Sequence, residues 1–265
     1  MQKIAIINLK GGVGKSITTI NLAAEFAARG LRVLVVDLDK QANTTKFYDC
    51  LDYDMPSAAD LLLQDATLED CADNLAALDG PKGIDLVSAN MRLLKANKQI
   101  MLDPVEPQLT RLRDALAPAE RKYDIALFDC PPDLDMGSLN ALTAANWALV
   151  PVDCDEWATD GLREISHQME QIKMYHNPHL KLLGVVLTKY HHTKAAAKAV
   201  YNAASMGYSL LQQMIRYTTR VPEARSAHKP LREFAPDCTA AQDYSGLADE
   251  ILQKIGVHSG HNTEG

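Results

Sequence analysis

The stretch INLKGGVGKSITTINLAAE, residues 7–25, decides the fold of this chain. Its first residues belong to KIAIINL, residues 3–9, an apolar segment that predicts a buried strand. After this strand, the pattern predicts a helix from Lys15 to about Arg29, and Gly30 is a residue type that commonly ends a helix. The glycines lie between the two. The stretch therefore predicts a strand, a glycine-rich loop and a helix in direct succession.

That succession is the setting of a phosphate-binding loop. Glycines let backbone N–H groups converge on phosphate oxygens, and the new helix adds its positive end. Lys15 supplies a charge for the outer phosphates, and Ser16 supplies a hydroxyl for Mg²⁺. The strict pattern G-x-x-x-x-G-K-[ST] is not fully met, because Leu9 occupies the first glycine position. The predicted nucleotide-binding residues are Lys10, Gly11, Gly12, Val13, Gly14, Lys15, Ser16 and Ile17.

The rest of the chain alternates apolar runs with helical patterns, which predicts βαβ units and a parallel sheet. Further strands are expected at residues 32–38, 84–89, 123–129, 147–153 and 180–188, and at LLQQMI, residues 210–215. Further helices are expected at residues 58–63, 91–117, 156–175 and 239–255. We expect an α/β fold with a doubly wound, mostly parallel sheet flanked by helices. One domain over residues 1–256 would be followed by a disordered tail, residues 257–265.

The bulk composition is that of a globular protein, with 265 residues of which 47% are apolar and 23% charged. Five cysteines without a CxxC pair indicate neither a disulfide framework nor a zinc site. No apolar stretch approaches the ~20 residues of a membrane span. No signal peptide is evident at the N-terminus. A cytoplasmic protein without a membrane partner is therefore expected.

The net charge of −7 conceals an uneven distribution. Residues 181–232 hold nine basic side chains and one acid, a local charge of 9 − 1 = +8, which leaves −15 for the remainder. Such a chain can offer a basic face to a polyanion in spite of its acidic total. Lys194 and Lys198 lie four residues apart within this segment, so they share one face of a predicted helix.

The motif KGGVGKS, with its leading lysine, resembles the deviant Walker A motif of the ParA/MinD group of P-loop ATPases. Similarity to ParA extends over nearly the whole chain, through DCPPDLDMGSLNALTAANWALVPVDCDEWATDGL, GVVLT, VPEARSAHKP and YSGLADEIL. The resemblance implies that Lys10 reaches the nucleotide of a partner subunit. The catalytic residues would then be Lys10, Lys15 and Asp39.

Two carboxylate segments take roles from the same resemblance. In VVDLDKQANTT, Asp39 would orient the attacking water and Asp37 would lie near the metal. In IALFDCPP, Asp129 would hold Mg²⁺ through water, so that Ser16, Asp37 and Asp129 form the metal site. The chain departs from the family at Lys40 and Ala42, where proline and glycine are common.

Within the group, the chain is most similar to the short Soj-like ParA class. It shows no amphipathic membrane helix of the MinD type, no paired cluster cysteines and no N-terminal helix-turn-helix. The resemblance implies an ATP-bound homodimer that binds DNA in the nucleoid without sequence preference. It also implies a ParB-like partner, which stimulates hydrolysis and so releases the dimer from DNA. The expected cofactors are ATP and Mg²⁺, and the expected DNA contacts are Lys194, Lys198 and Arg220.

Two alternatives stay open from the sequence. One keeps the ATPase but gives it a protein assembly as cargo instead of DNA. The other is a ligase resembling dethiobiotin synthetase, which uses a related loop on a small carboxylated substrate. Lys10 and the DCPP segment speak against the ligase.

Overall fold

The computed structural model describes residues 1–78, 80–153, 159–191 and 208–257. In this part of the chain the strands form a seven-stranded sheet with the order β3-β4-β2-β5-β1-β6-β7. The strands are β1 (Gln2–Ile6), β2 (Val33–Asp37), β3 (Ala72–Asn74), β4 (Ile84–Val87), β5 (Ile125–Asp129), β6 (Trp147–Asp153) and β7 (Lys181–Thr188). Neighbouring strands are parallel, except that β3 pairs antiparallel with β4. The predicted doubly wound, mostly parallel sheet is confirmed.

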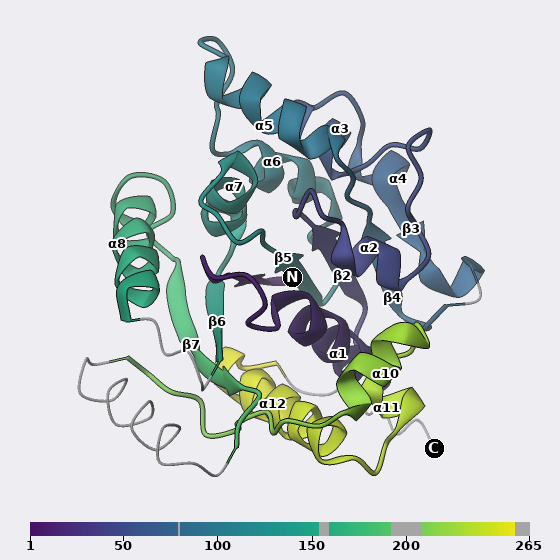
Figure 1. Ribbon diagram of the computed structural model, residues 1–265. Helices are drawn as coiled ribbons and strands as arrows, with labels where there is room; N and C mark the ends of the chain where they lie inside the picture. Colours follow the sequence, from purple (N-terminus) through teal and green to yellow (C-terminus); the bar gives the residue numbers. More distant parts are fainter. Residues whose placement is uncertain (79, 154–158, 192–207, 258–265) are drawn as a thin grey trace.

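Helices cover both faces of the sheet (Figure 1). On one face lie α3 (Ala58–Leu63), α5 (Arg92–Leu102), α6 (Arg111–Leu116), α7 (Met136–Ala144) and α8 (Thr159–Tyr175). On the other lie α1 (Lys15–Ala28), α10 (Arg220–Ser226), α11 (Leu231–Phe234) and α12 (Thr239–Ile255). The shorter elements are α2 (Asn43–Phe47), α4 (Leu68–Cys71) and the 3₁₀ turns η1 (Leu75–Leu78) and η2 (Ala117–Ala119).

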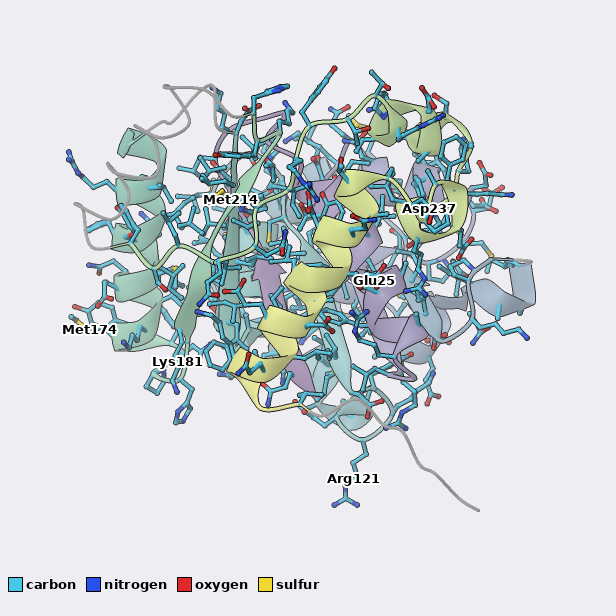
Figure 2. The ribbon with its side chains drawn as sticks, turned by 90° about the horizontal axis from the view of Figure 1, so that it is seen from below. Glu25, Arg121, Met174, Lys181, Met214 and Asp237 are labelled. Carbon is cyan, nitrogen blue, oxygen red and sulfur yellow. The ribbon has the colours of Figure 1, made fainter. Side chains whose placement is uncertain are left out.

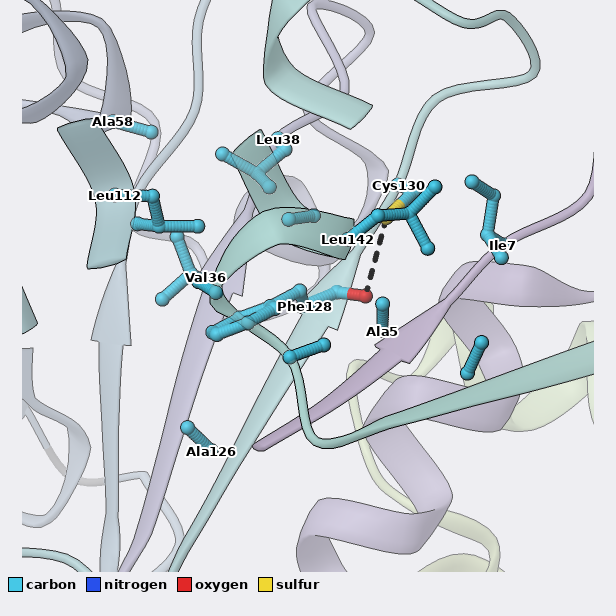
Figure 3. Close-up of a cluster of buried hydrophobic side chains, with 14 of the residues drawn as sticks. Ala5, Ile7, Val36, Leu38, Ala58, Leu112, Ala126, Phe128, Cys130 and Leu142 are labelled. Atoms are coloured by element: carbon cyan, nitrogen blue, oxygen red, sulfur yellow. Dashed lines mark hydrogen bonds between the residues drawn. The ribbon is translucent and has the colours of Figure 1, made fainter. Parts of the chain in front are cut away.

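The alternation of side chains along β1 divides the core into two layers. Ala5 and Ile7 point to the layer under α5–α7, which Figure 3 shows around Phe128, while Ile4 and Ile6 point to the layer under α1 and α12. All four are fully buried. Seen from below in Figure 2, α12 crosses this second face beside α1. Burial on both faces explains why the strand sequences are continuous apolar runs.

Two sequence predictions are corrected by the structure. The helix expected over residues 91–117 is interrupted between α5 and α6, where Pro104 and Pro107 lack the N–H that a helix interior requires. The strand expected at residues 210–215 is not regular: Leu210 forms an isolated bridge with Val185 of β7, and Arg216 forms one with Tyr190, just after β7. Between them the backbone N–H groups of Gln212 and Gln213 donate to the Glu250 carboxylate instead of to a strand, each at 2.9 Å.

None of the helices in the described ranges is both long and apolar enough to cross a membrane. The helix expected around Lys194 and Lys198, and most of the expected tail, lie outside the described residues.

Candidate nucleotide site

The glycine loop joins β1 to α1 at the carboxyl edge of the sheet. Gly12 and Gly14 adopt φ angles of 79° and 93°, which L-residues with a side chain rarely reach. An added Cβ at Gly12 would meet no atom within 4 Å, so packing does not explain this glycine. The conformation turns the loop over open space at the start of α1, which is the arrangement that an anion requires there.

Lys15 is held against this loop by the loop's own backbone. Its Nζ donates to the carbonyl oxygens of Asn8 and Lys10, at 2.9 and 3.0 Å, and the residue is 8% exposed. Burial lowers the pKa of Lys15, and the negative charge of Asp129 opposes that shift. A phosphate group would therefore find a desolvated ammonium group already positioned beside the glycines.

Asp37 and Asp129 end neighbouring strands and are paired in register. Both oxygens of Asp37 are satisfied: Oδ2 accepts from the N–H and hydroxyl of Thr45, and Oδ1 accepts from the N–H of Asp39. Asp129 Oδ2 accepts from the Thr44 hydroxyl at 2.6 Å. Its Oδ1 is buried and has no hydrogen-bond partner among the described residues. Asp129 is thus the carboxylate with an oxygen left for a ligand.

Burial strongly perturbs this carboxylate pair. Desolvation, followed by the charge of Asp129, raises the pKa of Asp37 to about 8. Desolvation also raises the pKa of Asp129 to about 6, although the hydroxyl of Thr44 stabilises its charged form. A Mg²⁺ ion fits this donor set, because hard cations prefer carboxylate and hydroxyl oxygens and would compensate the buried negative charge.

Asp39 reaches the same region from the loop after β2. It is 6% exposed, and its Oδ1 accepts from the backbone N–H of Gln41 at 2.9 Å. Lys40 donates to Asp133 Oδ2 at 3.0 Å and so joins this loop to the loop after β5. The predicted residues Lys15, Ser16 and Asp39 therefore line one cavity.

Ala42 adopts a backbone conformation that favours glycine. Its φ and ψ angles of 53° and 44° are left-handed, a conformation that costs a non-glycine residue about 1–2 kcal/mol. Glycine loses about 0.5–1 kcal/mol more backbone entropy on folding. Because Ala42 is 1% exposed, the change also removes a buried methyl group worth about 0.8 kcal/mol, so we expect Ala42→Gly to change the free energy of unfolding by less than about 0.5 kcal/mol in urea. Ala24→Gly, within α1, is the control and should destabilise by about 1 kcal/mol; equal destabilisation by both changes would contradict the strain at Ala42.

Two adjoining cavities meet at the glycine loop. The larger, about 680 Å³, is lined by Gly11, Gly12, Gly14, Lys15, Ser16, Ile17, Ile20, Asp39, Gln41, Asn43, Lys46, Phe47, Pro132, Arg225, Ser226 and His228. The smaller, about 270 Å³, is lined by Gly12, Gly14, Ile17, Thr188, Lys189, Ile215, Arg216, Tyr217, Thr218, Val221, Pro222, Arg225 and Tyr244. Both contain residues to which the sequence assigned no role. Some of them lie in segments that resemble ParA, such as GVVLT, VPEARSAHKP and YSGLADEIL, but the resemblance identifies no contact there.

Lys10 stands apart from both cavities. It is half-buried and is absent from the described residues that line either one. Its backbone is fixed: the N–H donates to Asn8 Oδ1 at 3.0 Å, and Asn8 Nδ2 donates to the carbonyl of Pro151 at 2.7 Å. Lys15 Nζ thus contacts the Lys10 carbonyl, but only Lys15 lines the larger cavity.

Fewer cations of the basic segment, residues 181–232, are available to a ligand than its charge count predicts. Three of its cations pair with acids elsewhere in the chain: Lys189 with Asp153, Arg216 with Asp243, and Arg232 with Glu25. Arg220 is exposed at the start of α10 and pairs with Glu223 at 2.7 Å. Of the predicted DNA contacts, Arg220 alone is described; Lys194 and Lys198 are not.

The fold and the loop define a P-loop nucleotide-binding protein, and comparison with known proteins specifies its family. A family model described as "AAA domain" matches residues 1–182. The chain is 34% identical to the chromosome partitioning protein ParA of Caulobacter vibrioides over 96% of this chain and 95% of that one. It is also 34% identical to the chromosome-partitioning ATPase Soj of Thermus thermophilus, over 96% and 97%. The chain belongs to the ParA/Soj family of P-loop ATPases.

A solved structure shares both the fold and part of the sequence. Cobyrinic acid a,c-diamide synthase from Mycobacterium smegmatis, with bound ATP analog and magnesium, has a TM-score of 0.84 and 27% identity over 97% of this chain and 96% of that one. The two curated relatives confirm the resemblance to ParA, and the synthase was solved with an ATP analog and magnesium bound.

Proposed function

We propose that this protein is an Mg²⁺-dependent partition ATPase whose ATP-bound dimer binds DNA without sequence preference. A ParB-like partner stimulates its slow hydrolysis and releases it from the nucleoid. The observation that carries the ATPase is the meeting of Lys15, Ser16 and Asp39 in one cavity beside Asp129, whose Oδ1 has no partner in the described chain. The curated ParA and Soj relatives support the partition role.

The chain's own groups account for binding and positioning of the phosphates. Backbone N–H groups of the glycine loop and the Nζ of Lys15 face the place where the outer phosphates would lie. Asp39, at the rim of the same cavity, would accept a hydrogen bond from the attacking water. Ser16, Asp37 and Asp129 would hold Mg²⁺, which neutralises phosphate charge when bound.

DNA binding is proposed from the basic segment, in which Arg220 is exposed at the N-terminal end of α10. Phosphate neutralisation by lysine and arginine supplies affinity without sequence preference, and it falls as salt rises. A dimer doubles the number of such contacts, so nucleotide-driven pairing would also control DNA affinity.

Two other functions remain candidates. An ATPase whose cargo is a protein assembly would not need a basic face. Three cations of the basic segment are already paired within the chain, which is consistent with such a cargo. An ATP-dependent ligase on a small carboxylated substrate is favoured by one observation, the 27% identity to cobyrinic acid a,c-diamide synthase.

One experiment separates these functions. The purified protein should hydrolyse ATP with Mg²⁺ and no added metabolite, and Lys15→Ala should lower the turnover by about 10²–10³-fold, the typical cost of losing one preorganised donor to transferring charge. Lys95→Ala, an exposed lysine of α5 outside both cavities, is the control. Turnover only with a metabolite would favour the ligase. Co-sedimentation with DNA only in the presence of ATP would exclude a purely protein cargo.

A further inference from the structure

The two cavities at the glycine loop share part of their lining. Gly12, Gly14, Ile17 and Arg225 line both, and Arg225 is the one charged side chain among these four. The larger cavity holds Lys15 and Ser16, so it suits phosphate groups. The smaller one is lined by Ile215, Val221 and Tyr244, and its cations Lys189 and Arg216 are paired with Asp153 and Asp243. It therefore suits a flat, largely apolar group. Arg225 stands at the junction between them.

The guanidinium of Arg225 differs from those of the neighbouring arginines in its ion pairing. Arg216, Arg220 and Arg232 each pair with a carboxylate. None of the ion pairs in the described chain includes the Arg225 side chain. An arginine exposed beside a cavity, without an acid to neutralise it, is available to an anionic ligand.

The backbone that carries Arg225 is well anchored. Ala224, the preceding residue of α10, is 3% exposed, and its carbonyl accepts from the N–H of Lys229. In the turn after α10, the N–H of His228 donates to the carbonyl of Arg225. The His228 ring stacks on Phe47 of α2, with centroids 6.2 Å apart, and its Nδ1 lies 3.1 Å from the Phe47 carbonyl oxygen. α10 is thus tied to α2, across the larger cavity.

A nucleotide with its outer phosphates at Lys15 and its base in the smaller cavity would place its sugar and first phosphate at the junction. We propose that Arg225 binds the α-phosphate of this nucleotide through its guanidinium. The proposal rests on the proposed ATPase function and assigns the residue that joins the phosphate part of the site to the base part. A guanidinium offers two parallel N–H donors to a phosphate, whereas an ammonium group offers a point charge.

The α-phosphate assignment has a distinctive consequence. ATP, ADP and AMP all carry that phosphate, and adenosine does not. Loss of Arg225 should therefore weaken ATP and ADP by the same factor, about tenfold, the lower end of what a hydrogen bond to a charged group contributes. Lysine should restore only part of the affinity.

The test is calorimetric titration of the full-length protein with Mg²⁺ and ADP, with a non-hydrolysable ATP analogue, and with AMP. The proteins compared are the wild type, Arg225→Ala, Arg225→Lys and the control Lys229→Ala. Lys229 is an exposed cation in the same segment that lines neither cavity. Equal weakening of both nucleotides and of AMP by Arg225→Ala, with Lys229→Ala unchanged, supports the proposal, because AMP carries the α-phosphate alone.

Two results would overturn it: nucleotide affinities of Arg225→Ala equal to those of the wild type, or a loss confined to the ATP analogue, which would move the contact to the γ-phosphate. If the wild type itself binds no adenine nucleotide, the proposed function fails instead. The unfolding temperature of the nucleotide-free Arg225→Ala protein should match that of the wild type, because the side chain is exposed and unpaired in the described chain.

Discussion

Asp39→Ala is expected to lower ATP turnover by about 10²–10⁴-fold, the usual contribution of a positioned acid or base, while ATP remains bound. The carboxylate lies at the rim of the cavity that contains Lys15 and Ser16, and it is nine-tenths buried. Its removal leaves the glycine loop and Lys15 unchanged, so the phosphates keep their binding groups. Turnover should be followed by phosphate release, and binding by titration with a non-hydrolysable analogue.

Under the proposed function, the same variant should accumulate as a dimer in ATP, because the nucleotide proposed to close the dimer would no longer be consumed. Light scattering after size-exclusion chromatography measures this directly. Asp39→Asn is the isosteric comparison: it can keep the hydrogen bond from the Gln41 N–H but cannot accept a proton. Asp54→Ala, an exposed acid outside both cavities, is the control. Turnover above a tenth of the wild-type value in Asp39→Ala would remove Asp39 from the mechanism.

Much of the fold follows from local sequence. Continuous apolar runs predict six of the strands in the described sheet, because a strand covered by helices on both faces has no polar side. The exception is β3, whose three residues ADN carry no strand signal and which forms only by pairing antiparallel with β4. At α12 the amphipathic pattern predicts a helix over residues 239–255, and the structure has it there.

The carboxylates of the site could also be expected from the sequence. Parallel strands bring their carboxyl ends to one edge, so Asp37 and Asp129 were bound to lie close if β2 and β5 were neighbours. Which of the two keeps an open oxygen was not predictable. That depends on Thr44 and Thr45 of α2, whose hydroxyls turn toward the strands only in the folded chain.

Ion pairs between residues far apart in the chain could not be predicted from the sequence. The count of +8 over residues 181–232 treats each cation as available, yet Arg216 meets Asp243 and Arg232 meets Glu25 far along the chain. Arg225 was overlooked for the same reason: its position between two cavities arises from the docking of α10 against the glycine loop and α2.

Lys10→Ala is expected to abolish ATP-dependent pairing while each chain still binds ATP. The side chain lies outside both cavities of its own chain, so removing it leaves the groups around the phosphates in place. The backbone of Lys10 is fixed at β1 and β6 through Asn8, which would hold the side chain at the carboxyl edge of the sheet, where a second copy would face it. If Lys10 contacts the partner's triphosphate, a two-fold dimer contains that contact twice.

Truncating one partner of a buried interfacial charge pair costs about 2–5 kcal/mol, so two symmetric losses should raise the dimer dissociation constant by about 10³-fold or more. The measurement is best made in the Asp39→Ala background, where hydrolysis does not empty the site. The double variant should remain monomeric by light scattering at concentrations where Asp39→Ala is dimeric, and Lys95→Ala in the same background should still pair. Because ATP affinity of the monomer is measured separately, a loss of pairing cannot be attributed to an empty site. Undiminished pairing of the double variant would show that the second lysine of the loop acts within its own chain.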